Sequence, residues 1–147
     1  METPQNAIDL CKRFEGLKLK PYLCPAGVST IGYGSTRYLD GRRVRLTDPP
    51  ITEKMALLLL MAELTAAEIG VIKYCPILAM DTWKRGAIMD FVYNLGLGNL
   101  QSSTLRRMIN QQKWGEVVKQ LNKWIWGGGK KLPGLILRRA AEGRYFK

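Results

Sequence analysis

The distribution of apolar residues along the chain predicts helices at both ends and an extended segment between them. Residues 4–16 have apolar positions at helical spacing among polar ones, which predicts a short helix that ends near Glu15. Gly16 follows as the expected C-cap, because glycine readily adopts the left-handed conformation in which many helices end. The carboxyl of Glu15 would then lie at the negative end of the helix dipole, which disfavours its charged form.

Residues 22–50 lack the helical spacing and are rich in glycine and proline. Residues 28–33 are mostly β-branched or aromatic, and residues 38–46 form a second extended piece around an Asp40-Gly41 turn. Asp-Gly between extended segments is typical of a β-hairpin. We therefore expect a small, twisted β-sheet lobe over about residues 17–50.

From about residue 52 onward the pattern is helical. The stretch over residues 53–74 is apolar on nearly every side in its middle, which predicts a long buried helix, N-capped by Thr52, that joins two lobes. Further helices are expected over residues 82–95, from Ser103 or Thr104, over residues 114–124, and from Pro133 to Phe146. Strands followed by helices indicate an α+β fold. One domain over residues 1–147 is expected, with residues 1–16 and 51–147 in the helical lobe.

The balance of charged residues indicates which classes of partner the chain can bind. Lys and Arg number 23 against 12 Asp and Glu, which gives a net charge of +11 and favours a polyanionic partner. Nucleic acid, an anionic membrane face and the bacterial cell wall all qualify. No helix-turn-helix, zinc or RNP-type motif supports nucleic acid. Residues 135–147 are cationic and amphipathic, so a membrane-active or polyanion-binding protein without catalysis stays the alternative function.

The absence of histidine narrows the chemistry most. It excludes Ser-His-Asp and Cys-His sites, so that a general acid or base must be Glu, Asp, Lys, Tyr or Cys. Three cysteines (Cys11, Cys24 and Cys75) without a CxxC spacing form neither a disulfide framework nor a zinc site, although one internal pair stays open. We expect no metal and no cofactor.

The start of the chain carries charges and no apolar run, so we expect no signal peptide. The longest apolar run covers residues 55–62, less than half of the roughly 20 residues that span a bilayer. We therefore expect no transmembrane segment.

A carboxyl, a thiol and a hydroxyl follow one another along the chain at a distinctive spacing. Glu15 is followed after eight residues by Cys24, and Cys24 after five residues by Thr30. Residues 91–96 (FVYNLG), 103–105 (STL) and 128–142 (GGKKLPGL followed by RRAAE) complete the pattern. Together these segments resemble the phage-type lysozymes, or endolysins, of glycoside hydrolase family 24, which are related to the lysozyme of T-even phages.

The resemblance implies a lysozyme-like fold and hydrolysis of peptidoglycan at the β-1,4 bond between N-acetylmuramic acid and N-acetylglucosamine, causing host cell lysis. It implies that Glu15 is the general acid, that Thr30 holds the attacking water, and that Cys24 stands where many members carry an aspartate. Residues implied in substrate binding are Tyr93, Asn94, Thr104, Gln120 and Arg138, the last lying near Glu15. It also implies a monomer that accumulates in the host cytoplasm and reaches the wall in the periplasm with the help of a separate holin. Peripheral contact with an anionic membrane stays open.

Two positions depart from the family pattern. Cys24 is a thiol, whose ordinary pKa of about 8.5 leaves it mostly neutral at pH 7, and Ser35 stands where many relatives carry histidine. Three roles for Cys24 stay open: an auxiliary to the water, which predicts inversion at the anomeric carbon; a nucleophile, which predicts retention; or a half-buried structural thiol. Cleavage to an anhydro-sugar is a further variant. Among the tryptophans, core packing is expected for Trp83 and Trp114, and a place at the groove rim for Trp126.

Overall fold

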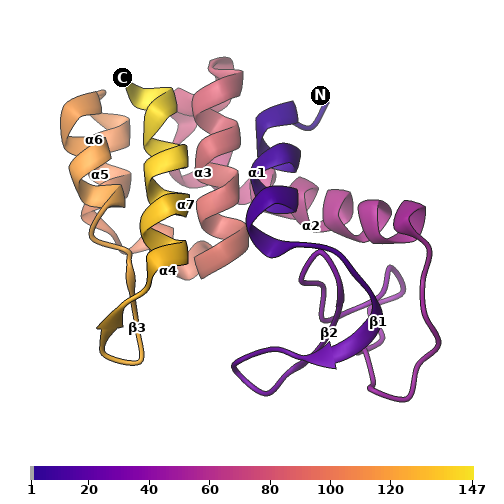
Figure 1. Ribbon diagram of the computed structural model, residues 1–147. Coiled ribbons are helices and arrows are strands. Elements are labelled where there is room, and N and C mark those ends of the chain that lie inside the picture. Colours follow the sequence, from indigo (N-terminus) through magenta and orange to yellow (C-terminus); the bar gives the residue numbers. More distant parts are fainter. Residues whose placement is uncertain (1) are drawn as a thin grey trace.

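In the computed structural model, which describes residues 2–147, a helical lobe carries a small β lobe on one side (Figure 1). The α+β arrangement of two lobes expected from the sequence is confirmed. The α-helices are α1 (Gln5–Glu15), α2 (Glu53–Tyr74), α3 (Thr82–Leu95), α4 (Leu97–Gln101), α5 (Thr104–Asn110), α6 (Trp114–Leu121) and α7 (Pro133–Gly143). The 3-10 turns η1 (Pro76–Met80) and η2 (Arg144–Phe146) follow α2 and α7. The strands are β1 (Lys18–Leu23), β2 (Ser29–Gly32), β3 (Trp126–Gly127) and β4 (Lys130–Lys131).

Helix α1 ends as the sequence predicts. Gly16 has a φ of 73° and donates its backbone N–H to Lys12 O, so the chain leaves the helix directly after Glu15. Strand β1 begins two residues later. The turn at Gly16 therefore sets Glu15 at the boundary between the helical lobe and the β lobe.

The β lobe is smaller in regular structure than expected, and its strands differ. β1 and β2 pair in antiparallel orientation with Tyr22 opposite Thr30, although the sequence interpretation did not assign a strand to residues 18–23. The extended piece expected over residues 38–46 has its turn at Gly41, but in place of a paired hairpin it has only an isolated bridge between Arg37 and Arg43. It is rich in exposed arginines, so it buries too little apolar surface to form a ladder.

Helix α2 has the predicted bounds and the predicted cap, since Thr52 Oγ1 accepts a hydrogen bond from the Met55 amide at 3.1 Å. It packs against α3 and β2 and buries side chains such as Leu60 and Leu64. By length and composition alone it also meets the requirement for a membrane span, with a mean hydropathy of 2.0 over 18 residues, of which 44% are buried within the protein. The sequence analysis counted only the longest uninterrupted apolar run, residues 55–62. Isolated polar residues interrupt the otherwise apolar helix, so that count did not predict that the helix as a whole is long and apolar enough to span a membrane.

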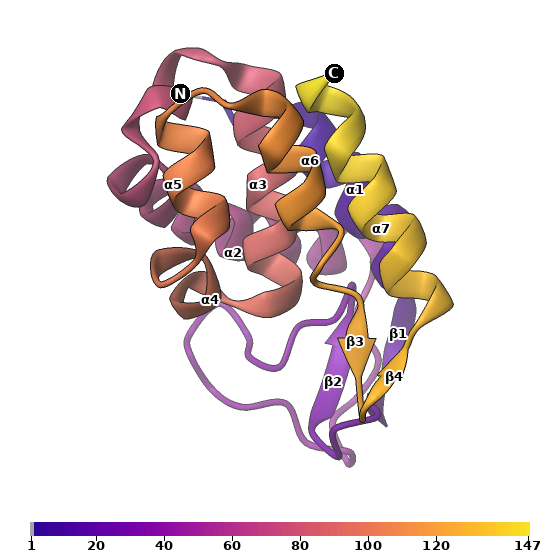
Figure 2. The same ribbon diagram turned by 90° about the vertical axis from the view of Figure 1, so that its left-hand side faces the viewer.

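Helix α3 lies at the centre of the helical lobe, in contact with α1, α2 and α7 (Figure 2). Its side chains Ile88, Met89 and Phe91 are fully buried. The helix begins and ends where the sequence predicts, and its depth in the lobe means that any polar side chain on it must find a partner inside the protein.

Three details of the helical lobe differ from the expectations. The short helix α4 was not predicted, and α6 ends at Leu121 instead of near residue 124. Trp83 is 57% exposed, so its expected place in the core is wrong; it lies in the first turn of α3 and stacks on Tyr145 at 6.2 Å between ring centroids. Trp114 is half-buried and packs on Phe146, as core packing predicts.

Candidate active site

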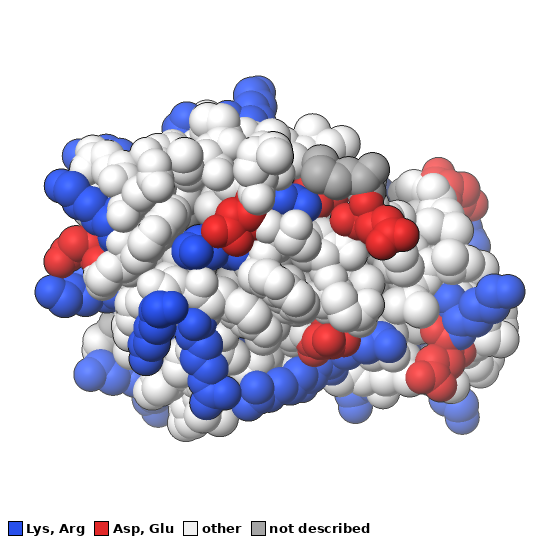
Figure 3. All heavy atoms as spheres, turned by 90° about the horizontal axis from the view of Figure 1, so that it is seen from above, with Lys and Arg blue, Asp and Glu red and all other residues white. Residues whose placement is uncertain are grey.

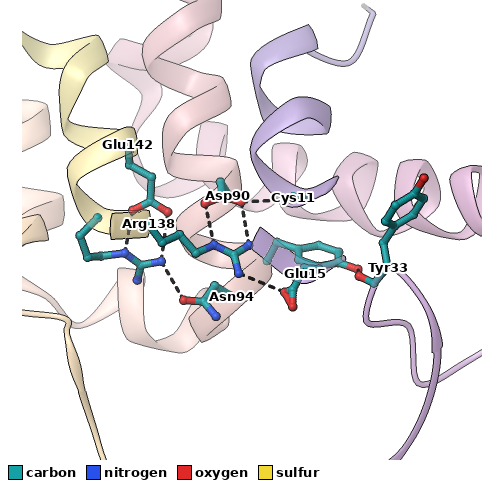
Figure 4. A network of polar contacts seen from close by, with 9 residues as sticks. Cys11, Glu15, Tyr33, Asp90, Asn94, Arg138 and Glu142 are labelled. Carbon is teal, nitrogen blue, oxygen red and sulfur yellow. Dashed lines mark hydrogen bonds and ion pairs between the residues drawn. The ribbon is translucent and has the colours of Figure 1, made fainter. Parts of the chain in front are cut away.

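The carboxyl of Glu15 lines a surface cavity of about 470 Å³ where α1 ends. Asn94 from α3 and Arg138 from α7 line the same cavity (Figure 4). The structure therefore brings together three of the side chains that the sequence nominated from positions far apart in the chain. The remaining lining residues come from the end of α1 and the start of α7: Phe14, Leu132, Pro133, Gly134 and Leu135.

A buried guanidinium connects Glu15 to the helical core. Arg138, 4% exposed, donates from Nη1 to Glu15 Oε2 at 3.0 Å. Its Nε and Nη2 donate to Asp90 Oδ2 and Oδ1 at 2.9 and 2.7 Å, which is the bidentate geometry that makes such pairs strong. Burial alone would lower the pKa of Arg138, but the hydrogen bonds and charge of Asp90, followed by Glu15, raise it. Arg138 therefore stays a cation shared between two carboxyls.

Asp90 is fully buried and accepts two kinds of donor. Besides Arg138, the Cys11 thiol donates to Asp90 Oδ1 at 3.2 Å. Burial would raise the pKa of Asp90, but the hydrogen bonds and charge of Arg138, together with the hydrogen bonds from Glu142 and Cys11, outweigh it and lower that pKa. Burial and the adjacent negative charge raise the pKa of the Cys11 thiol, so Cys11 stays protonated and acts as a donor.

A second arginine fixes the amide of Asn94. Arg139 is fully buried, donates from Nη2 to Asn94 Oδ1 at 2.7 Å, and pairs with Glu142, with Nε 2.9 Å from Oε1. Because a guanidinium can only donate hydrogen bonds, Asn94 must turn its oxygen toward Arg139. The Nδ2 of Asn94 is then the donor that this residue offers to the cavity.

Glu142 is the carboxyl that burial perturbs most clearly toward the neutral form. Its pKa is raised well above the ordinary value, first by burial and then by the hydrogen bond and charge of Asp90. Arg138 and Arg139 act in the opposite direction but do not offset burial. Asp90 therefore carries the negative charge of this cluster, and Glu142 a proton.

The β lobe contributes a hairpin that carries Cys24 and Thr30. Thr30 Oγ1 donates to Val28 O at 2.8 Å. Hydrogen bonding of the Val28 amide to the sulfur lowers the pKa of the Cys24 thiol, with smaller contributions from other backbone amides and the Thr30 hydroxyl. Burial raises the pKa of Tyr22, and the charges of Glu15 and Cys24 raise it further. Tyr22 therefore lies within electrostatic reach of both proposed catalytic groups.

A glycine allows the β lobe to approach Glu15. Gly34 has a φ of 91°, and a Cβ at this position would lie 3.2 Å from Glu15 Oε1. Both the backbone conformation and the close approach disfavour any side chain here. Glu15 thus has Arg138 against one carboxyl oxygen and the backbone of the β lobe against the other.

Five nominated residues do not line this cavity: Cys24 and Thr30 of the β lobe, and Tyr93, Thr104 and Gln120. The Tyr93 hydroxyl donates to Tyr33 O at 2.6 Å, and burial raises its pKa, so Tyr93 connects the helical lobe to the β lobe. Thr104 begins α5 and accepts from Arg107. Gln120 lies on α6, half-buried.

The sequence interpretation missed Asp90, Cys11 and the role of Glu142. A signal was present for Asp90, because it precedes Asn94 by one helical turn and is the acidic residue within a predicted core helix. Cys11 and Glu142 gave no comparable signal. The partners of a buried charge depend on which helices pack together. The spacing of residues along one helix does not reveal this packing.

Two other expectations are settled by the site. The C-terminal segment does not present a cationic face at Arg138 and Arg139, since both side chains are buried and contact Asp90 and Glu142. All three cysteines are free, so the internal disulfide that the sequence left open does not form. Among residues 2–147, no group of three or more Cys, Asp or Glu side chains is placed to hold a metal ion.

The phage lysozyme family matches the chain over residues 12–142. A SAR-endolysin of Bacteriophage PS119 is 37% identical over 128 residues, which cover 87% of this chain and 73% of that relative. The endolysin of Acyrthosiphon pisum secondary endosymbiont phage 1 is 33% identical over 154 residues, covering 100% of this chain and 99% of its own. The solved endolysin from Escherichia coli O157:H7 phage FAHEc1 superimposes with a TM-score of 0.87 at 29% identity, over 99% of this chain and 93% of its own.

The fold and the site thus define a two-lobed lysozyme with an acidic residue at the junction of the lobes. The chain belongs to the phage lysozyme family. The lysozyme-like fold, the muramidase class of enzyme and the peptidoglycan-degrading function in lysis that the sequence predicted are confirmed. The alternative of a cationic binder without catalysis is not favoured.

The protonated state of Glu142 gives a prediction for stability. Because its folded pKa is raised, the unfolded chain loses this proton above about pH 4.3 while the folded protein keeps it. Glu142 therefore lowers the free energy of unfolding as the pH rises, by up to about 1.4 kcal/mol per pH unit. Glu142→Gln, which mimics the neutral form, should remove this slope in urea unfolding measured at pH 5 and pH 8.

The matched control is Glu116→Gln, which breaks an exposed pair with Lys119 and should leave the pH dependence as in the wild type. A Glu142→Gln variant that falls in stability with pH as steeply as the wild type would show that Glu142 is ionised in the folded protein.

Proposed function

We propose that Glu15 is the general acid of a muramidase that hydrolyses the β-1,4 bond between N-acetylmuramic acid and N-acetylglucosamine. The observation that carries this proposal is the ion pair between Glu15 and Arg138 at 3.0 Å within the cavity at the end of α1. Glycosidic cleavage needs a protonated carboxyl beside the leaving oxygen and a second group on the far face of the sugar. Glu15 supplies the first, and the β1–β2 hairpin supplies the second.

The contacts of Glu15 favour a proton on one particular oxygen. Arg138 donates to Oε2, so that oxygen acts as an acceptor and the proton belongs on Oε1, which lies toward Gly34 and the β lobe. Asp90 holds Arg138 in place through a bidentate pair. The guanidinium therefore fixes the orientation of the Glu15 carboxyl.

Thr30 and Cys24 would act on the water that attacks the sugar. The Thr30 hydroxyl directs its one proton to Val28 O or to the Cys24 sulfur, so in either case its oxygen lone pairs are available to accept a hydrogen bond from a water and to fix its position. The lowered pKa of Cys24 gives this thiol more negative character than an ordinary cysteine, in the place where relatives carry an aspartate. A partial thiolate would stabilise positive charge that develops on the sugar ring.

The substrate would bind through Asn94 and the walls of the cavity. The Nδ2 of Asn94 is oriented as a donor by Arg139, which suits the acetamido or hydroxyl oxygens of a sugar. Tyr93, Thr104 and Gln120 remain predictions from the resemblance, since all three lie outside the lining of this cavity.

The cell-wall partner fits the surface charge. Figure 3 shows lysine and arginine side chains spread around one face of the molecule, with aspartate and glutamate side chains lying among them, and the net charge of the whole chain is +11. Such a surface favours association with the anionic wall and, more weakly, with an anionic membrane face, at low ionic strength.

For localisation, the proposal is a single-domain monomer that accumulates in the host cytoplasm and acts on the wall in the periplasm after a separate holin opens the membrane. Expression in a bacterial host with and without a holin tests this route. Lysis that requires the holin supports it, and lysis without any holin contradicts it. The name SAR-endolysin of several relatives makes the second outcome a concrete alternative.

The catalytic assignment predicts different effects for two substitutions. Glu15→Gln should keep the contact with Arg138 and reduce lysis of outer-membrane-stripped Gram-negative cells about 10²- to 10⁴-fold, because a general acid contributes this much. Cys24→Ser should retain much of the rate, since the Thr30 hydroxyl still positions the water. Turbidity loss is the measurement, with circular dichroism to show that each variant is folded. Glu15→Gln that clears cells as fast as the wild type would remove Glu15 from the mechanism.

The role of Cys24 fixes the stereochemistry of the product. A water held by Thr30 attacks from the face opposite the leaving group, so the β-linked sugar should be released first as the α-anomer. Proton NMR of the anomeric signals early in hydrolysis measures this. The β-anomer would show a covalent intermediate on Cys24, and products one water lighter by mass spectrometry would show anhydro-sugar formation.

A further inference from the structure

The short hairpin of β3 and β4 directly precedes residues that form one wall of the Glu15 cavity. Trp126 of β3 pairs with Lys131 of β4, and the next residue, Leu132, lines the cavity. In Figure 1 this hairpin and the β lobe extend from the helices toward the same side of the molecule. The hairpin is therefore continuous with the wall of the proposed catalytic cavity.

Two contacts hold the base of the hairpin in place. The Leu132 amide donates to Ile125 O at 2.9 Å. The Leu132 side chain covers Gly127 so closely that a Cβ there would lie 2.5 Å from Leu132 Cδ1. The side chains of the hairpin thus start from a fixed base beside the cavity.

The hairpin carries two lysines whose charges are not compensated. Lys130 and Lys131 are exposed, and neither forms an ion pair with any residue that the structure describes. Lys131 Nζ lies 5.5 Å from the ring centroid of Trp126, which is itself 57% exposed. A cation–π contact orients an ammonium group and leaves its N–H donors free for an anion.

The arginines at the cavity cannot serve the same purpose. Arg138 is occupied by Glu15 and Asp90, and Arg139 by Glu142 and Asn94. An anionic substituent of a glycan that extends along this wall of the cavity would therefore meet the free cations of the hairpin.

We propose that Lys130 and Lys131 bind the free carboxylates of the peptides that substitute the glycan, and that Trp126 positions Lys131 for this contact. This inference rests on the proposed cleavage of peptidoglycan at Glu15, because it is the muramic acid unit that carries the peptide. A flexible peptide presents its carboxylates in many orientations, which suits the point charge of lysine better than the fixed fork of arginine. The hairpin would thus select peptide-bearing strands.

The experiment compares purified peptidoglycan with peptidoglycan whose peptide carboxylates have been converted to neutral amides with carbodiimide and glycine amide. Lys130→Gln/Lys131→Gln should raise the KM on untreated peptidoglycan about threefold to tenfold with little change in kcat, because exposed ion pairs are individually weak. On the amidated material the variant and the wild type should have the same KM. Trp126→Phe should have the KM of the wild type, because phenylalanine keeps an aromatic ring for Lys131. Trp126→Ala should raise the KM less than the double lysine substitution does, because Lys131 keeps its charge but loses its position.

The control is Lys54→Gln/Lys113→Gln, which removes the same charge from exposed positions on α2 and before α6. An equal rise in KM in this control would show a general charge effect and overturn the proposal. So would a hairpin variant with unchanged KM, or one impaired equally on amidated peptidoglycan.

Sedimentation with vesicles of phosphatidylglycerol and phosphatidylcholine tests whether the two lysines bind a membrane instead of peptide carboxylates. Loss of vesicle binding in a hairpin variant with normal KM would assign the lysines to lipid. Absence of cleavage of either material by the wild type would contradict the proposed function itself.

Discussion

The guanidinium of Arg138 is the group on which the geometry of the site depends. It is buried where α1, α3 and α7 meet, and it holds Glu15 on one side and Asp90 on the other. A buried cation of this kind is costly unless its donors are satisfied by well-placed anions. The packing of the three helices and the orientation of the proposed acid therefore depend on the same ion pairs of Arg138.

This constraint explains why the surrounding residues are polar in the middle of a helical core. Asp90 needs further donors, and Cys11 provides one. Glu142 lies close enough to Asp90 that burial and charge favour its neutral form. Arg139 then completes the cluster and fixes Asn94 at the cavity. The cluster extends from the protein interior to the surface, where Glu15 and Asn94 line the cavity.

Much of the fold and the central carboxyl could be predicted from the sequence, because they depend on local patterns. Gly16 marks the end of α1, Thr52 marks the start of α2, and the spacing of Glu15, Cys24 and Thr30 is contained within one segment.

Strand β1 was missed because Pro21 and the flanking lysines hide its alternation of apolar and polar residues. The ion pairs of Arg138 could be anticipated only for Glu15, since the pairing with Asp90 depends on how α3 packs against α7. The place of Trp83 on the surface likewise follows from which face of α3 meets its neighbours.

The central claim is that Asp90 holds Arg138 in the position from which it orients the Glu15 carboxyl. The most direct measurement is the steady-state kinetics of the wild type, Asp90→Asn and Asp90→Glu on peptidoglycan, at a temperature where circular dichroism shows all three folded. Asp90→Asn loses the charge of the bidentate pair with Arg138, so kcat should fall while KM changes little, and Asp90→Glu, which restores that charge, should recover part of the kcat. An Asp90→Asn variant with the kcat of the wild type would contradict the account.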